Sequence, residues 1–211
     1  MFAFEYVGTE DHPAYQHLAI ANLDRQYSFL RSVVLASLDL KRPMLSLEVI
    51  QALNFHAISC LHSNAGQLRP CQVHVGDYQP CPPWEVPARM AMFVDEVNRY
   101  WDPTDPVYLA AFVLWRLNHI HPFINGNGRT ARVAAYFVLC LKAGQWLPGD
   151  VLLPELIKRN RPAYVAALKH ADASLAEGPV DLTELHSLLE RLLKEQLPPA
   201  DMGDDEVQPS E

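Results

Sequence analysis

The sequence predicts an all-α protein with one small β-hairpin, and three observations support this fold class. Apolar residues recur at helical spacing through most of the chain. Two segments, residues 107–119 and 129–143, are apolar on nearly all sides, which is typical of buried central helices. Residues 71–80 instead alternate apolar and polar side chains and are followed by prolines, which predicts a hairpin flap.

The first third of the chain is expected to contain two helical regions. Residues 1–13 show no periodicity and are expected to be irregular. From Ala14 to Leu40 an apolar stripe predicts a helix in two pieces, and Pro43 follows its end. Ser46 is a typical N-cap for a second helix, with Gly66 as its C-terminal stop.

The flap and the helices after it are delimited by turn residues. Gly76 offers a turn between the alternating residues around it, and Pro80 excludes a helix there. Pro106 suits the first position of a buried helix. Further helices are expected over residues 87–101, 107–119, 129–143, 160–173 and 181–197. The three expected parts are an N-terminal helical extension (1–44), a main domain (45–197) and an acidic, disordered tail (198–211).

Composition excludes several classes of function. The net charge of −8 argues against nucleic-acid binding, which would require a basic surface. No secretory signal and no apolar run of about 20 residues is visible, so we expect a cytoplasmic protein that does not contact a membrane. The four cysteines lack the close pairing of a zinc site and are expected to be reduced and mostly buried.

Residues 121–132, HPFINGNGRTAR, concentrate polar and flexible residues between the two apolar helices. The first N–H groups of a helix have no partner within it, and the helix dipole places partial positive charge there. Gly126 and Gly128 let the backbone approach a ligand closely. The turn is therefore expected to bind phosphate oxygens.

Three side chains in this segment add chemistry to the turn. Arg129 and Arg132 share a helix face, and two guanidinium groups beside an N–H nest predict a polyphosphate ligand. His121 precedes the turn and has the ordinary pKa of a general base at neutral pH. Each residue alone has a structural alternative, such as a helix cap, a surface ion pair or a core histidine. Packing does not easily explain all of them within twelve residues.

This segment resembles the signature of Fic-domain proteins, His-x-Phe-x-Asp/Glu-Gly-Asn-Gly/Lys-Arg-x-x-Arg, and meets seven of its eight defined positions. The stretches GQLRPCQVHVG and RPAYVAALKHAD are similar to the flap and to a later helix of that family. The resemblance extends over roughly residues 45–195 and implies a Fic-type helical domain with the hairpin flap near 71–80.

The resemblance implies an activity. Most Fic proteins transfer AMP from ATP to a hydroxyl group of a target protein, and some relatives move other phosphate-linked groups. His121 would be the general base acting on a Ser, Thr or Tyr hydroxyl, and Phe123 would anchor the loop. The implied nucleotide-binding residues are Gly126, Asn127, Gly128, Arg129 and Arg132. The implied target-docking flap includes Val73, His74, Val75 and Gly76.

One position departs from the family pattern. The acidic residue that helps hold Mg²⁺ on the ATP phosphates is Asn125 here, and a neutral amide oxygen coordinates Mg²⁺ more weakly than a carboxylate. Three readings therefore remain open: a slow AMP transferase, an enzyme with another donor, or a nucleotide-binding regulatory module with little catalysis.

Regulation is only weakly indicated. Many family members carry an inhibitory Ser/Thr-x-x-x-Glu-Gly/Asn helix, but Glu177-Gly178 here follows Ala173 at the position of the Ser or Thr, so a polar loop explains it better. Inhibition by a separate small partner or by homo-oligomer contacts is equally open, and the target protein and the transferred group are not specified by the sequence.

Overall fold

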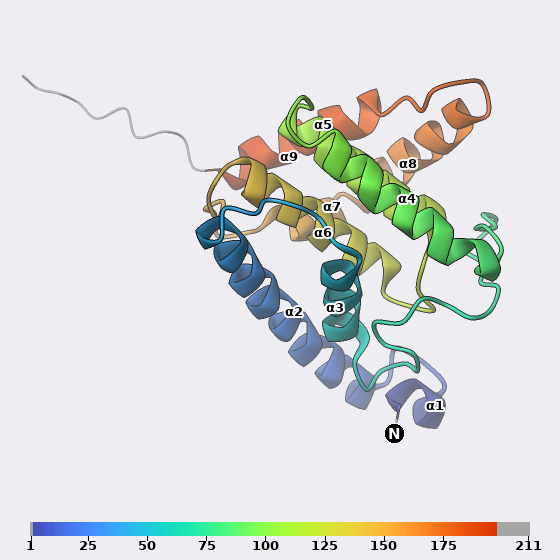
Figure 1. The fold of residues 1–211 in the computed structure, drawn as a ribbon. Coiled ribbons are helices and arrows are strands. Elements are labelled where there is room, and N and C mark those ends of the chain that lie inside the picture. The colour runs from blue at the N-terminus through green and yellow to red at the C-terminus, as the bar shows by residue number, and fades with distance from the viewer. Residues whose placement is uncertain (1, 198–211) are drawn as a thin grey trace, which may run out of the picture.

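The computed structural model describes residues 2–197, and this part is helical without a strand (Figure 1). The predicted all-α class is confirmed. The α-helices are α1 (Ala3–Val7), α2 (Pro13–Asp39), α3 (Leu47–Ile58), α4 (Val86–Arg99), α5 (Pro106–Ile120), α6 (Asn127–Lys142), α7 (Leu153–Arg159), α8 (Arg161–Leu175) and α9 (Thr183–Gln196), and a 3₁₀ turn, η1 (Pro83–Glu85), precedes α4. The predicted tail, 198–211, lies outside the described residues.

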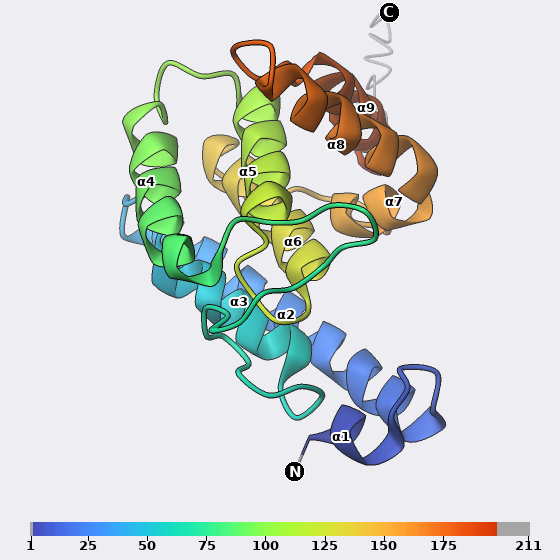
Figure 2. The same cartoon turned by 90° about the vertical axis from the view of Figure 1, so that its right-hand side faces the viewer.

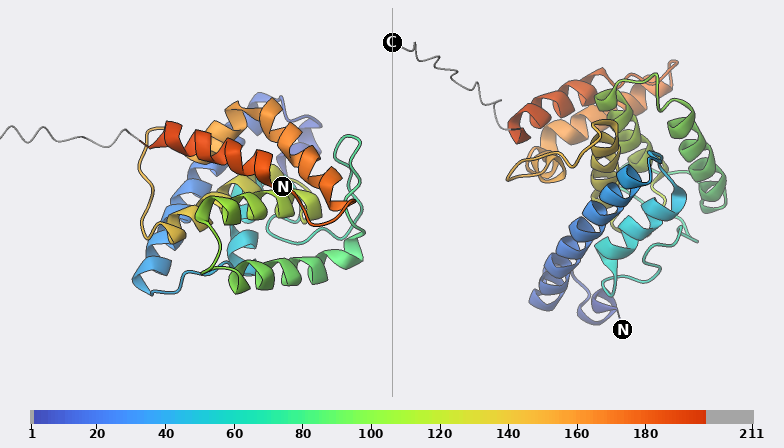
Figure 3. Two further views of the ribbon diagram at one scale, coloured as in Figure 1. Left: turned by 90° about the horizontal axis from the view of Figure 1, so that it is seen from above. Right: turned by 60° about the vertical axis from the view of Figure 1, so that its left-hand side comes forward.

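The helices α5 and α6 form the centre of the molecule and pack directly on each other. Both are buried on most sides, as their apolar composition predicts. The pair α2 and α3 covers α6 on one side, α4 packs against α5, and α7, α8 and α9 close the remaining side (Figures 1 and 2). Figure 3 shows α2 and α3 side by side beneath the central pair. The loop that joins α5 to α6 is thus held between packed layers.

The first turns of α3 and α5 are capped by side chains, and the predicted role of Ser46 is confirmed. Ser46 Oγ accepts a hydrogen bond from the Val49 N–H at 3.2 Å, which caps α3. Asp105 accepts from the first turn of α5, and Pro106 is the first residue of that helix, where a missing N–H is harmless.

The N-terminal region is more regular than predicted. Residues 3–7 form α1 rather than an irregular segment, and α2 is one continuous helix rather than two pieces. Two buried polar residues interrupt the apolar stripe of α2, and each donates a hydrogen bond to a backbone carbonyl, although Gln26 Oε1 is buried without a partner. Asn22 Nδ2 donates to the Ser59 carbonyl at 2.8 Å, and Gln26 Nε2 donates to that of Leu53 at 2.9 Å. These bonds keep the helix unbroken.

The second helix ends earlier than the sequence suggests. The helix α3 stops at Ile58, and Cys60 has a positive φ of 61°. Gly66 lies in the turn that folds back onto α3, where a Cβ would meet the Gln51 carbonyl oxygen at 2.9 Å. Gly66 is therefore required by a close approach of two backbone segments and not by a helix end. The helix α7 was not predicted at all, because its seven residues are too few to show periodicity.

The prediction of a regular β-hairpin at 71–80 is wrong. Its only backbone pairing among the described residues joins Val75 and Tyr78, which exchange two N–H···O bonds of 3.0 Å. Proline has no N–H to extend a ladder, and Pro80 lies two residues after Tyr78. The segment is a loop closed by one turn, and we call residues 71–81 the flap loop.

No helix in residues 2–197 combines the length and the apolar character needed to cross a membrane. All four cysteines are free thiols, and the expectation that most are buried is wrong, since Cys60 and Cys71 are exposed.

Candidate active site

The segment that joins α5 to α6 begins at His121, which ends α5 in the left-handed conformation (φ 52°, ψ 60°). This conformation is uncommon for a residue with a side chain, and such residues concentrate at functional sites. The His121 N–H still bonds the Leu117 carbonyl at 3.0 Å, so the helix holds the residue firmly.

Burial sets the protonation state of His121. Desolvation lowers the pKa of the His121 ring from its ordinary value to about 4, because the charged form loses water. A hydrogen bond to the Asn118 backbone opposes this shift, and the charge of Arg69 adds to it. At neutral pH the ring is therefore uncharged. With one nitrogen donating to a carbonyl, the other nitrogen has a lone pair available.

The side chain of Asn127 closes the loop into a ring. Its Oδ1 accepts from the Phe123 N–H at 2.9 Å and its Nδ2 donates to the Phe123 carbonyl at 2.8 Å. Phe123 is buried, which agrees with the expected role of an anchor. The Asn127 side chain is therefore committed to holding the loop, and only its backbone remains for a ligand.

Gly126 is placed against α3. Its φ is +76°, and a Cβ there would meet Ile58 Cγ2 at 2.6 Å and Asn54 Nδ2 at 3.1 Å. Asn54 Nδ2 also donates to the Asn125 carbonyl at 2.9 Å, which ties the loop to α3. A glycine is thus required here by backbone conformation and packing.

The start of α6 presents free donors. Among the described residues no acceptor binds the backbone N–H groups of Asn127, Gly128 or Arg129, whereas the Gly126 N–H donates to Asn125 Oδ1 at 2.6 Å. Three N–H groups therefore point out of the helix end, where the dipole favours an anion. Gly128 is open apart from Arg132 Nη1, which would lie 3.3 Å from a Cβ.

Arg129 and Asn125 are joined by a hydrogen bond that fixes both side chains. Arg129 Nη1 donates to the Ala57 carbonyl at 3.0 Å, and Nη2 donates to Asn125 Oδ1 at 2.9 Å. Asn125 Nδ2 donates to the Glu10 carboxylate at 3.1 Å. This amide orientation is unambiguous, because a guanidinium cannot accept a hydrogen bond and a carboxylate cannot donate one.

These contacts bear on the Mg²⁺ ion that the signature implies. Mg²⁺ prefers octahedral oxygen ligands, usually with carboxylates among them. The Asn125 oxygen faces a guanidinium, and within residues 2–197 no three His, Cys, Asp or Glu side chains are grouped to hold a metal ion. The residues as they stand do not fit Mg²⁺ at Asn125.

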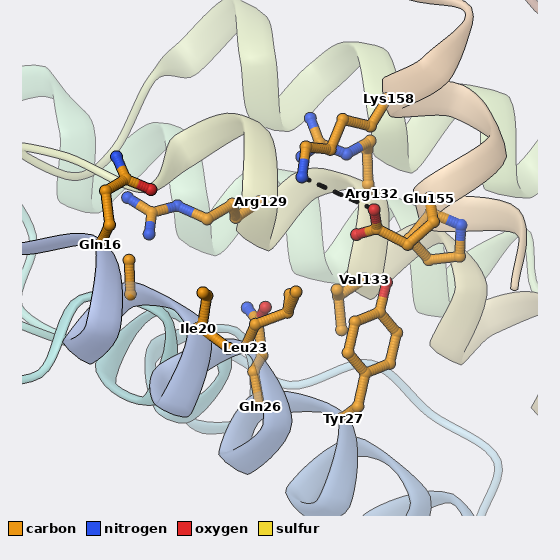
Figure 4. A pocket seen from close by; sticks show the side chains of 12 residues that line it. Gln16, Ile20, Leu23, Gln26, Tyr27, Arg129, Arg132, Val133, Glu155 and Lys158 are labelled. Atoms are coloured by element: carbon orange, nitrogen blue, oxygen red, sulfur yellow. Dashed lines mark ion pairs between the residues drawn. The ribbon is translucent and has the colours of Figure 1, made fainter. Parts of the chain in front are cut away.

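A groove opens beside the start of α6. It consists of two adjoining hollows of about 180 and about 380 Å³ that share five lining residues. Figure 4 shows one wall formed by α2, including Gln16, Ile20 and Tyr27, and the other formed by Arg129 and Arg132 of α6. We call it the basic groove, since four cationic side chains line it: Arg129, Arg132, Lys158 and Arg161.

The flap loop is fixed to the same loop by one buried arginine. Arg69 is 2% exposed, and its guanidinium group donates to three carbonyl oxygens, those of His121, Cys71 and Cys81. Both ends of the flap loop are thus joined to His121. Tyr78 adds a second anchor, since its hydroxyl donates to the His119 carbonyl at 2.7 Å.

Comparison with known proteins agrees with this geometry. Residues 44–139 match the Fic/DOC family. Residues 44–139 are thus similar to a Fic domain. A segment of 108 residues, 51% of this chain, is 38% identical to the protein adenylyltransferase Fic of Drosophila willistoni and covers 20% of that protein. The chain thus spans about a fifth of the length of this curated relative.

Solved Fic structures share the fold. Fic-1 from C. elegans superposes with a TM-score of 0.68 and 24% identity, over 92% of this chain and 54% of that one. A Fic-domain signaling protein from Bacteroides thetaiotaomicron gives a TM-score of 0.64 at 24% identity, over 90% of this chain and 75% of that one.

Within the matched segment the structure groups the signature residues around the end of α5 and the start of α6. The exposed residues His74, Val75 and Gly76 lie on the flap loop, and Val73 is half-buried. Glu177 lies in the turn after α8 and makes no ion pair with Arg132 among the described residues. Sequence reasoning missed Arg69, Lys158, Arg161 and Glu10, because each comes from a segment distant from the signature.

Proposed function

We propose that this protein is a protein adenylyltransferase that moves AMP from ATP to a Ser, Thr or Tyr hydroxyl of a target protein. The curated relative named above has this activity in its name and supports the proposal. The observation that carries it is the row of three free N–H groups at the start of α6, which opens beside the basic groove.

The reaction assigns a task to each group. The target oxygen forms a bond to the α-phosphorus of ATP, the bond from that phosphorus to the bridging β-phosphate oxygen breaks, and pyrophosphate leaves. The hydroxyl proton passes to the neutral ring of His121. The N–H groups of Asn127, Gly128 and Arg129 stabilise the charge that develops on the phosphate oxygens. Arg129 and Arg132 bind the leaving pyrophosphate.

The flap loop is the expected docking site of the target. Its residues 74–77 are exposed, and Val75 is paired only with Tyr78 across the turn. An extended target segment can add main-chain hydrogen bonds there with little dependence on its sequence. Since Arg69 and Tyr78 attach the flap loop to α5, a docked hydroxyl would be held at a defined position relative to His121.

The test is intact-mass measurement of the protein after incubation with each nucleoside triphosphate in turn, with a cell lysate labelled in parallel by α-labelled ATP. We expect the mass of one adenylyl group to be added with ATP. His121→Ala should reduce the rate by about 10² to 10⁴-fold, the usual contribution of a general base. His17→Ala is the matched control, because His17 is exposed on α2 and makes no contact with the site. Equal labelling by His121→Ala would exclude His121 as the base.

A second candidate function is nucleotide binding without transfer, in a regulatory module. The hydrogen bond from Arg129 to Asn125 favours it, because that oxygen is not free for a metal. In this case calorimetry would show ATP binding that His121→Ala leaves unchanged, while no nucleoside triphosphate would add mass to a protein. Mass added by a different nucleotide would instead indicate transfer of another phosphate-linked group.

A further inference from the structure

The basic groove gathers more positive charge than the Fic signature specifies. Arg129 and Arg132 belong to the signature, but Lys158 comes from α7 and Arg161 from the start of α8. None of the three arginines forms an ion pair in the part of the chain that the structure describes. Lys158 has only a loose pair with Glu155, with an N–O distance of 3.6 Å and a 60% exposed lysine.

Such a grouping is unfavourable without a ligand. Four cationic side chains share the groove with two carboxylates, Glu10 and Glu155, which leaves an excess of two positive charges. The cations repel one another, and an anion with several charges removes this repulsion. The acidic overall charge of −8 makes this local excess of cations more specific, since it does not follow from composition. The groove therefore suits a polyphosphate rather than a single carboxylate or phosphate.

The oxygen atoms beside Asn125 are already engaged in hydrogen bonds. Asn125 Oδ1 accepts from Arg129 and from the Gly126 N–H. The nearest carboxylate, Glu10, accepts from Asn125 Nδ2 at 3.1 Å. A Mg²⁺ ion at this position would have to displace a guanidinium and rotate the amide.

We propose that the basic groove binds the polyphosphate of its nucleotide without a divalent cation, with Lys158 and Arg161 supplying the two positive charges that Mg²⁺ would bring. The inference rests on the proposed function in that it concerns the same nucleotide site. It adds two binding residues and removes the metal requirement from the binding step.

Calorimetric titration with ATP, in EDTA and then in excess Mg²⁺, tests this directly. We expect the Kd for ATP in EDTA and the Kd in excess Mg²⁺ to agree within about threefold. A Kd that is weaker by about tenfold or more in EDTA would overturn the inference. AMP should bind more weakly than ATP in EDTA, because it lacks the phosphates that the four cations contact.

Two variants separate a charge effect from a folding defect. Lys158→Met and Arg161→Met should each weaken ATP binding in EDTA by about tenfold, the effect of losing one charge-assisted hydrogen bond. Lys169→Met on α8 is the matched control, because Lys169 is exposed and lies outside the groove. Unchanged affinity in both groove variants would overturn the proposal.

A third variant introduces the carboxylate that the family pattern has at position 125. Asn125→Asp places a second carboxylate opposite Glu10, where the amide now donates at 3.1 Å. We expect ATP binding by Asn125→Asp to become dependent on Mg²⁺, and the double variant with Glu10→Gln to lose this dependence. If Asn125→Asp binds equally well in EDTA and Mg²⁺, the charge argument at this position is wrong.

These results are distinguishable from a failure of the proposed function. Tight ATP binding in EDTA without any transfer would exclude the adenylyltransferase and leave the metal-free groove intact. AMP transfer by a protein whose ATP binding requires Mg²⁺ would support the adenylyltransferase and exclude the metal-free groove.

Discussion

The Nε of Arg69 donates a hydrogen bond to the carbonyl oxygen of His121 at 2.8 Å, and the Arg69 N–H donates to the neighbouring Pro122 carbonyl at 2.8 Å. Because the rest of this guanidinium binds Cys71 and Cys81, one buried side chain joins the histidine to both ends of the flap loop. The arginine has no acidic partner in the described residues, and its partners are three backbone oxygens and the Cys81 sulfur.

Arg69→Met should lower the free energy of unfolding by about 3 kcal/mol or more, because three buried carbonyl oxygens lose their donor. Urea unfolding measures this. Arg69→Lys should recover part of the stability, since an ammonium group keeps the charge but cannot reproduce the fork. Arg99→Met is the control, because Arg99 is exposed on α4, and we expect a change below about 0.5 kcal/mol. Equal stability of Arg69→Met and the parent would contradict this role.

The depressed pKa of His121 predicts the pH dependence of the reaction. A His whose pKa is about 4 in the folded protein is neutral at pH 5 and above, so kcat/KM should not fall on its account until the pH approaches 4. A profile of kcat/KM against pH, measured under conditions where the transfer step limits the rate, would show this. An acid limb near pH 6.5 would mean that the ring is solvated in the free enzyme.

The same shift predicts a stability effect. The unfolded chain has the ordinary His pKa of about 6.5, so between pH 6.5 and 4 it binds more protons than the folded chain. The contribution of neutral His121 is therefore complete above pH 6.5 and is lost as the pH falls towards 4. Urea unfolding at pH 7 and pH 5 should show a smaller loss for His121→Gln than for the parent. Equal losses would contradict the burial of this ring.

Gly126→Ala should be strongly destabilising, by about 2–4 kcal/mol, because the new Cβ meets Ile58 at 2.6 Å in a left-handed backbone. Gly144→Ala is a matched control: its φ is +70°, but nothing lies within 4 Å of the added atom. That variant should lose only about 1–2 kcal/mol from backbone strain. Thermal unfolding of both gives the packing effect as the difference, and equal losses would show that α3 yields to the added methyl group.

Tyr78→Phe tests the flap loop without altering the nucleotide site. The variant loses the hydrogen bond from the hydroxyl to the His119 carbonyl, so the flap loop should become less well ordered. We expect the KM for a target peptide to rise about 3- to 10-fold, the effect of one hydrogen bond, with the Kd for ATP unchanged. Tyr100→Phe, on the exposed tyrosine that follows the last residue of α4, should change neither value. A KM unaffected by Tyr78→Phe would separate the flap loop from target docking.

The helices and the signature loop were predictable because their signals are local. Apolar periodicity gave α5 and α6, and the capping role of Ser46 and the position of Pro106 are properties of neighbouring residues. The row of free N–H groups at the start of α6 follows from the same local rules.

What could not be predicted depends on contacts between distant segments. The continuity of α2 requires Asn22 and Gln26 to find carbonyls more than 25 positions away. Gly126 was expected to be a phosphate-binding residue, but its N–H is taken by Asn125 and its lack of a side chain serves packing against Ile58. The role of Arg69 could not be predicted, because the sequence does not distinguish an arginine that is buried against carbonyl oxygens from one on the surface.

The wall that α2 forms along the basic groove lies outside residues 44–139, the part that matches the family. Ile20, Leu23 and Tyr27 of this helix line the groove beside the proposed phosphate-binding arginines, where they are available to the rest of a bound nucleotide. On the proposed function, two chains with identical signature loops would differ in the surface that their N-terminal helices present to the nucleotide. A fragment cut back to residues 44–139 would keep the signature loop but lose the α2 wall of the groove, together with Glu10, Lys158 and Arg161.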